Sequence, residues 1–152
     1  EANKYADEKE SIYRKIYGKQ MRPIKGLLKF LKDLKKNKIN IAVASSAPPK
    51  NIDFILKGLQ IKKYFNIIVN GTEIRKSKPN PKIYLKASDK MKVKPSKCIV
   101  FEDSLSGIKA AKNAGMNVIA LATTHNKDEL SDADYVIKDF TKMPISKLKC
   151  LN

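Results

Sequence analysis

The chain has 152 residues, of which 42% are hydrophobic, and its 32 Lys and Arg against 15 Asp and Glu give a formal net charge of +17. This length suits one compact domain with a sizeable core. No apolar run reaches the length of a membrane span, and none has the layout of a signal peptide, so we expect a cytoplasmic protein without a membrane partner.

The positive charge by itself would suggest nucleic-acid binding, because clustered cations gain affinity by releasing phosphate counterions. Only Arg14, Arg22 and Arg75 are arginines, and the lysines are scattered over the predicted helix faces. Base and phosphate readers favour arginine forks, and no recognition motif accompanies the charge. We therefore expect no specific nucleic-acid partner.

The first part of the chain predicts helices before strands. Apolar residues at helical spacing predict an amphipathic helix over residues 1–20, and Pro23 opens a second one with an apolar stripe over residues 24–34. The apolar run 39–44 then predicts a short strand that ends at Ser45. A loop with two prolines follows, and helical periodicity returns over residues 52–59.

The same succession of strand, loop and helix follows twice more. A strand is predicted at 67–69, a long loop leads to a helix at 83–91, and a third strand at 98–101 precedes a helix at 105–114. Gly115 directly follows this last helix, at a position where glycine commonly ends a helix.

Two more apolar runs, 118–121 and 135–137, predict strands, and a weak helical pattern ends the chain. Strands that alternate with helices in this way favour an α/β fold with a parallel sheet and helices on both faces.

Two adjacent carboxylates, Glu102 and Asp103, directly follow one of the predicted strands. Neighbouring carboxylates repel each other as anions, so both stay ionised easily only beside a cation such as Mg2+. Loops after the carboxyl ends of parallel strands are also where α/β sheets bind ligands. The alternative is that Asp103 or Ser104 only caps the following helix.

Two other loops bring phosphate-binding groups to the same predicted edge of the sheet. The Ser45 hydroxyl and the backbone amide of Ser46 can donate hydrogen bonds to phosphoryl oxygens, and Lys78 supplies a positive charge. With the acid pair, these residues predict a site for a phosphoryl group and a metal ion.

In order and spacing, these segments resemble three motifs of the haloacid dehalogenase superfamily, and more closely its β-phosphoglucomutase and small-phosphatase branch. The matching segments are Val43-Ala44-Ser45-Ser46, Lys78-Pro79-Asn80-Pro81 and Phe101-Glu102-Asp103-Ser104. The resemblance implies a Rossmann-like three-layer sandwich and a Mg2+-dependent phosphoryl transfer through an aspartyl-phosphate. It further implies that Ser45 and Lys78 are catalytic residues that bind the phosphoryl group, and that Glu102 and Asp103 bind the metal.

The family's first motif, an apolar strand ending in Asp-x-Asp, has no counterpart in this sequence. The Asp-x-Asp that is present, Asp132-Ala133-Asp134, precedes a predicted strand and so lies at its entrance. In the family the first strand lies in the middle of the sheet, which implies two unpaired edges here, on the strands at 39–44 and 98–101.

The resemblance also implies a division of the chain. Residues 1–20 are expected to be the end of a helical cap, and residues 21–152 a core domain without its first strand. We therefore expect the chain alone to be inactive. A preceding N-terminal segment of a longer parent protein, or another chain, would fill the gap and supply the nucleophile.

A phosphatase acting on a small phosphorylated metabolite is the function that we favour. Mutases of this branch hold a second phosphate with a Ser-Lys pair soon after the serine, whereas this sequence has Ala47-Pro48 there, with Lys50 and Asn51 as the nearest substitutes for substrate binding. A sugar-phosphate mutase is therefore an alternative. A noncatalytic fragment or a basic polyanion-binding module is another, and the missing nucleophile is its best support.

Overall fold

The computed structural model describes residues 2–151, and the side chains of residues 8–151. Glu1 and the first side chains of the helix predicted over 1–20 lie outside this part. The order of helices and strands is the predicted alternation, with short 3-10 turns added at Lys62–Tyr64, Gly71–Glu73 and Pro95–Lys97. Within the described residues, no helix has both the length and the apolar character needed to cross a membrane.

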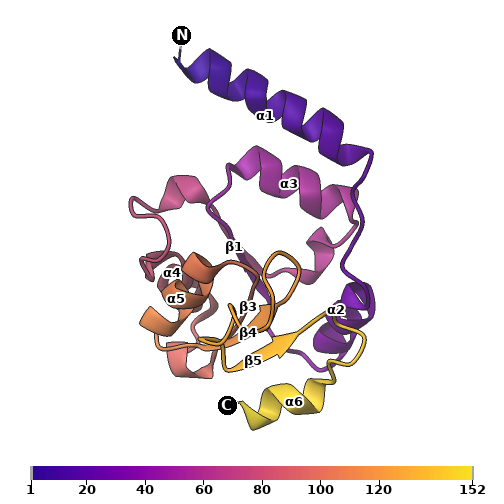
Figure 1. Cartoon of the computed structure of the whole chain (residues 1–152), viewed down its shortest axis with the longest axis vertical. Coiled ribbons are helices and arrows are strands. Elements are labelled where there is room, and N and C mark those ends of the chain that lie inside the picture. The colour runs from indigo at the N-terminus through magenta and orange to yellow at the C-terminus, as the bar shows by residue number, and fades with distance from the viewer. Residues whose placement is uncertain (1, 152) are drawn as a thin grey trace.

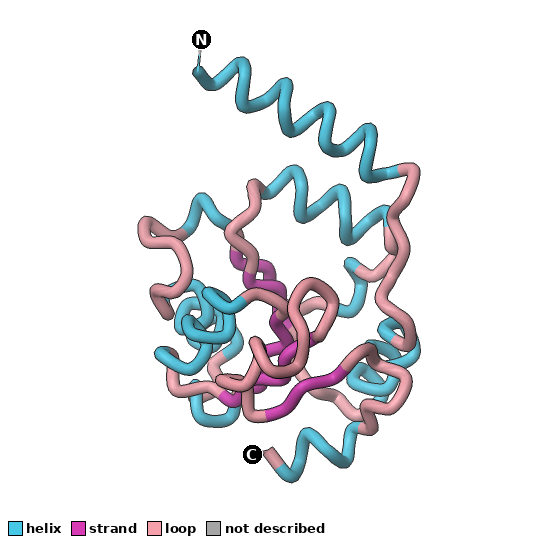
Figure 2. Tube along the Cα trace, viewed as in Figure 1, coloured by secondary structure: helices cyan, strands magenta, loops and turns pink. Residues whose placement is uncertain are grey.

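The strands form two small parallel sheets, which run through the interior in Figure 2. In the first sheet, β1 (Ala42–Ala44) pairs with β2 (Ile67–Val69). The second sheet has the order β3-β4-β5, with β3 at Ile99–Glu102, β4 at Asn117–Leu121 and β5 at Tyr135–Ile137. The predicted strands and their parallel direction are thus confirmed.

The first strand is shorter than the run 39–44 predicts. The Ile39 amide donates to the Leu34 carbonyl at 3.0 Å, so the start of this apolar run closes the preceding helix instead of extending the sheet.

The two sheets do not join. Within residues 2–151, β1 pairs only with β2, and β3 pairs only with β4, so each has one edge without a partner strand. The break lies between the two strands for which the sequence predicted unpaired edges.

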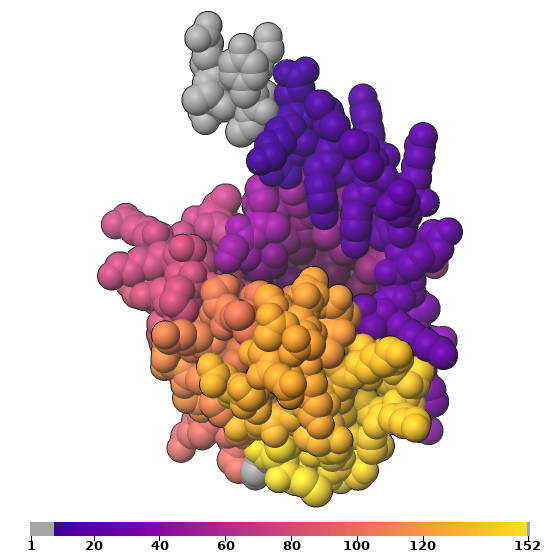
Figure 3. Space-filling model, in the orientation of Figure 1, coloured from indigo at the N-terminus to yellow at the C-terminus, as the bar shows by residue number. Residues whose placement is uncertain are grey.

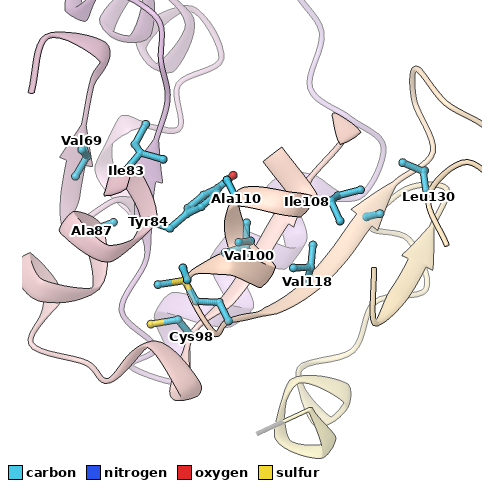
Figure 4. Packing of buried hydrophobic residues seen from close by; sticks show 14 residues of the cluster. Val69, Ile83, Tyr84, Ala87, Cys98, Val100, Ile108, Ala110, Val118 and Leu130 are labelled. Atoms are coloured by element: carbon cyan, nitrogen blue, oxygen red, sulfur yellow. The ribbon is translucent and has the colours of Figure 1, made fainter. Parts of the chain in front are cut away.

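Helices cover both faces of the strands, as expected for a three-layer sandwich. On one face α4 (Lys82–Met91) and α5 (Leu105–Asn113) pack against Val100 and Val118 in the cluster of Figure 4. On the other face lie α2 (Leu27–Lys36), α3 (Pro49–Gly58) and α6 (Ile145–Cys150), whose apolar side chains form a second cluster.

The β4 strand separates the two clusters by the alternation of its side chains. Val118 and Ala120 belong to the cluster under α4 and α5, whereas Ile119 and Leu121 belong to the other. All four are almost fully buried, which is why this strand reads as a continuous apolar run in the sequence.

The helix α1 (Ala2–Gly18) projects from these layers and packs on α3, as Figures 1 and 3 show. Asn51 of α3 connects the two helices: it accepts a hydrogen bond from Arg14 at 2.6 Å and donates one to Glu10. The outer side of α1 carries the exposed side chains of Ile12 and Ile16.

Candidate functional site

The loops that follow the strands meet at one edge of the two sheets. The Gly71 amide, after β2, donates to the Ala47 carbonyl, after β1, at 3.1 Å. Further along the loop after β2, the Lys78 ammonium reaches Glu102 at the end of β3. The Thr124 hydroxyl, after β4, donates to the Asp103 carbonyl at 3.1 Å. These hydrogen bonds join the loop after β1 to the loop after β2, the loop after β2 to the end of β3, and the loop after β4 to the residue that follows β3.

Glu102 lies at the centre of the polar contacts, and its side chain is only 10% exposed. Its Oε2 accepts hydrogen bonds from Lys78 Nζ at 2.6 Å and from the Tyr84 hydroxyl at 2.5 Å. Its Oε1 accepts from the backbone amides of Asp103 and Ser104, both at 3.1 Å, and from Ser104 Oγ at 2.9 Å. Both carboxylate oxygens are thus engaged with donors of the protein itself.

The two neighbouring carboxyl groups are shifted in opposite directions. Burial acts to raise the pKa of Glu102, but the Lys78 ammonium and the hydrogen bonds outweigh it and lower that pKa to about 2. Burial, and then the adjacent Glu102 carboxylate, raise the pKa of Asp103. Burial, followed by the charge of Glu102, also raises the pKa of Tyr84, so this phenol keeps its proton and remains a donor.

The turn after Glu102 depends on two small residues. Ser104 caps α5 by accepting a hydrogen bond from the Gly107 amide at 3.1 Å. The cap anticipated in the sequence is therefore Ser104 and not Asp103. The Glu102 side chain folds back over this first helical turn, where a Cβ on residue 107 would overlap its carboxyl group.

Asp103 is the carboxylate of the pair that has the weaker protein contacts. Its side chain accepts a long hydrogen bond of 3.5 Å from the Thr123 hydroxyl. Among the described residues, no three His, Cys, Asp or Glu side chains gather in a group that could hold a metal. Mg2+ often uses one or two carboxylates together with water and phosphate oxygens, so Asp103 offers one suitable ligand but no complete site.

The serines predicted to bind phosphate lie in the loop directly after β1. The half-buried Ser45 accepts a hydrogen bond from the Ala47 amide through Oγ, at 3.2 Å. Ser46 is exposed, and its carbonyl packs against Gly71. Because α3 begins at Pro49, Ser46 lies in the loop ahead of the helix and not at its first turn.

The two candidates for further substrate binding differ in their surroundings. Lys50 is exposed at the start of α3. Asn51 is only 6% exposed, and both ends of its side-chain amide are engaged by α1. The structure therefore brings Lys78, Glu102 and Asp103 together, while Asn51 contacts the projecting helix.

Sequence reasoning missed Tyr84, which contacts Glu102 directly. A signal was available, because this tyrosine lies on the apolar face of a predicted helix and a buried hydroxyl needs a hydrogen-bond partner. Asp132-Ala133-Asp134 lies at the entrance of β5, as predicted, and not at the end of a strand. Asp134 precedes β5, accepts from the amide of Val118 at 2.7 Å and pairs with Lys112 at 2.6 Å.

Comparison with known proteins gives a family match over most of the chain. The family model described as "Haloacid dehalogenase-like hydrolase" matches residues 1–121. A chloroplastic 5-amino-6-(5-phospho-D-ribitylamino)uracil phosphatase of Arabidopsis thaliana is 30% identical over 99% of this chain and 40% of its own length. A phosphorylated carbohydrates phosphatase of Thermotoga maritima is 35% identical over 78% of this chain and 58% of its own length. The chain thus spans roughly half the length of these relatives.

Solved structures show the same fold. A HAD hydrolase of family IA, variant 3, from Entamoeba histolytica superposes with a TM-score of 0.90 and 34% identity, covering 99% of this chain and 70% of the other. A beta-phosphoglucomutase from Clostridium difficile superposes with a TM-score of 0.85 and 26% identity, covering 96% of this chain and 64% of the other.

Proposed function

This chain belongs to the haloacid dehalogenase-like hydrolase family, and from that membership we propose that it forms the phosphoryl-binding part of a Mg2+-dependent phosphatase for small phosphorylated metabolites. One observation carries the proposal: a buried Lys78–Glu102 pair lies beside Asp103 at the loop edge of the sheets. Two of the relatives are phosphatases whose names specify phosphorylated ribitylaminouracil and phosphorylated carbohydrates.

In this proposal, Lys78 and Ser45 bind the phosphoryl oxygens. Lys78 has three donors, and its bond to Glu102 leaves donors for an anionic ligand. The Ser45 oxygen accepts a hydrogen bond from the Ala47 amide, and a hydroxyl that accepts can still donate its hydrogen to a ligand. The Ser46 amide adds a further donor. Phosphoryl transfer depends mainly on such positioning and on electrostatic stabilisation, for which these groups are suited.

Asp103 would hold the metal ion, and Glu102 would support it. A bound Mg2+ would offset the charge on the phosphoryl oxygens. Glu102 keeps Asp103 in place by accepting its backbone amide and that of Ser104. We therefore assign Asp103 to direct contact with the metal and Glu102 to the orientation of Asp103 and Lys78.

We further propose that the nucleophile lies on a strand outside the present sequence. A strand between β1 and β3 would pair with both free edges and end at the same edge as Ser45 and Asp103. A preceding N-terminal segment or another chain could supply it. In this arrangement residues 1–20 are the end of a cap and residues 21–152 the core, and the chain alone binds phosphate without turning a substrate over.

Hydrolysis is favoured over sugar-phosphate mutation. A mutase must hold a second phosphate opposite the first, and of the two candidate residues only Lys50 is exposed. Asn51 is committed to Arg14 and Glu10, so its amide is not available to a ligand. The likeness to the beta-phosphoglucomutase structure keeps the mutase as the second candidate.

The test uses the purified 152-residue chain with inorganic phosphate and Mg2+, followed by titration calorimetry. We expect phosphate binding that Lys78→Met abolishes and that Asp103→Asn makes insensitive to Mg2+. Lys29→Met is the matched control, because Lys29 is 83% exposed and pairs with Asp33 on its own helix. Equal phosphate binding by Lys78→Met and the control would contradict the proposal, as would turnover of p-nitrophenyl phosphate by the chain alone.

A further inference from the structure

Tyr84 contacts two residues of the proposed phosphate site, Glu102 and Lys78. It lies in the first turns of α4, is 5% exposed, and donates its hydroxyl to Glu102 Oε2 at 2.5 Å. The Lys78 ammonium lies 4.9 Å from the centroid of the same ring. Figure 4 shows the ring extending from α4 toward Val100 and Ala110.

The contact with Glu102 is shared between two donors. Glu102 Oε2 accepts hydrogen bonds from both the Tyr84 hydroxyl and the Lys78 ammonium, so the two donors share one acceptor atom. If the hydroxyl were absent, Lys78 would be the one donor left to this oxygen among the described residues. The carboxylate would also be freer to turn about its last torsion, which is soft in glutamate.

The ring acts on Lys78 as well. An ammonium within about 6 Å of an aromatic centroid is attracted to the face of the ring. The Tyr84 ring therefore restrains the Lys78 side chain directly, while the Tyr84 hydroxyl shares with Lys78 the carboxylate oxygen that also restrains it.

We propose that Tyr84 is a positioning residue whose hydroxyl limits the hold of Glu102 on Lys78 and so keeps the ammonium available to a phosphoryl oxygen. This inference rests on the proposed function, since it assumes that Lys78 binds phosphate. A purely structural role would instead require only that Tyr84 fill the core and satisfy its hydroxyl on the nearest acceptor.

The test compares Tyr84→Phe with Tyr64→Phe in the full chain. Tyr64 is a suitable control because it is also buried and lies near two ammonium groups, those of Lys35 and Lys63, but belongs to the cluster on the other face of the strands. Nitrogen-15 NMR detects the ammonium of Lys78, assigned with Lys78→Arg, and calorimetry with inorganic phosphate gives the affinity.

We expect Tyr84→Phe to shift the Lys78 ammonium resonance and to weaken phosphate binding by about tenfold, whereas Tyr64→Phe changes neither. A Lys78 resonance and a phosphate affinity equal to those of the wild type would overturn the inference, even if Tyr84→Phe unfolds more easily. Uniform incorporation of 3-fluorotyrosine strengthens the hydroxyl as a donor and should move the resonance in the opposite direction. If Tyr84→Phe does not fold, the 3-fluorotyrosine measurement tests the inference, and an unchanged Lys78 resonance would overturn it.

The two proposals can fail separately. If the wild-type chain binds no phosphate, the proposed function fails. The inference fails with it, because it assumes that Lys78 binds phosphate. If the wild-type chain binds phosphate and Tyr84→Phe leaves both the Lys78 resonance and the phosphate affinity unchanged, the inference alone fails.

Discussion

Gly107 lies so close to Glu102 that any Cβ at this position would overlap the Glu102 carboxyl group. Because residue 107 has no side chain, the Glu102 carboxylate has room to accept hydrogen bonds from the amides of Asp103 and Ser104 and from Lys78. The glycine is required here by the approach of a side chain. Its own backbone is ordinary helix.

Gly107→Ala should displace Glu102 from these donors. Overpacking costs about 1–3 kcal/mol, and alanine regains up to about 1 kcal/mol of helix propensity. We therefore expect a loss of about 1–2 kcal/mol in the free energy of unfolding, measured in urea, together with loss of phosphate binding.

The control for this change is Gly115→Ala, just beyond the same helix. Gly115 has a φ of +72°, but nothing lies within 4 Å of a Cβ there. Backbone strain should cost it about 1 kcal/mol and leave phosphate affinity unchanged. Loss of binding in both variants would mean that α5 stability, and not the Glu102 contact, controls the site.

Lys78→Met should destabilise the fold by about 2–3 kcal/mol, because it leaves the buried Glu102 charge without its cation. The two side chains are 15% and 10% exposed, so water can compensate little. Adding Glu102→Gln should restore part of the loss, and a double-mutant cycle by urea unfolding measures the coupling. A double variant as unstable as the sum of the two single variants would contradict this account.

The stability of the fold should fall in acid partly because of Glu102. Its pKa is about 2 in the folded protein against an ordinary 4.5, so its stabilising contribution is complete above pH 4.5 and is lost as the pH falls toward 2. For this group the loss amounts to about 2–3 kcal/mol. Urea unfolding between pH 2 and 7 should show a shallower decline for Glu102→Gln than for the wild type.

The contribution of Asp103 to the pH dependence of stability should have the opposite sign from that of Glu102, because the pKa of Asp103 is raised in the folded protein. The folded state takes up this proton before the unfolded chain does, so this group favours folding as the pH falls. Asp103→Asn should therefore make the acid loss steeper than in the wild type. A shallower decline would show that burial and the Glu102 charge do not raise the pKa of Asp103 in the folded protein.

Glu73→Gln should loosen the loop that leads to Lys78. Glu73 accepts the Asn70 amide at 3.2 Å and pairs with Lys90 of α4 at 2.5 Å, and these contacts lower its pKa to about 2. We expect faster hydrogen exchange at the amides of Asn70 and Thr72 and a loss of about 1 kcal/mol.

Glu129→Gln serves as the matched control, since Glu129 caps Asn126 in the same way at 2.9 Å in another loop. It should accelerate exchange only around residue 126. Equal acceleration of exchange at Asn70 and Thr72 in both variants would contradict the assignment of this effect to Glu73.

The sequence predicted the fold almost element by element, because buried strands and amphipathic helices leave periodic patterns. From the order of strands and loops it predicted that Ser45, Lys78 and the Glu102–Asp103 pair lie at one edge, and the structure joins Lys78 to Glu102 beside Asp103. The sequence did not reveal how Glu102 is shared among its donors, since the hydroxyl of Tyr84 and the room beside Gly107 depend on how α4 and α5 pack. The engagement of Asn51 by α1 is likewise a tertiary contact between distant helices.

The Lys78–Glu102 bond crosses the break in the sheet, because Lys78 follows β2 and Glu102 ends β3. This bond therefore links two sheets that, within residues 2–151, have no backbone hydrogen bonds between their strands. In the proposed function a bound phosphate would share the Lys78 ammonium with Glu102, so phosphate binding would weaken this contact between the two sheets. We therefore expect the distance between the two sheets to change when phosphate binds at the proposed site.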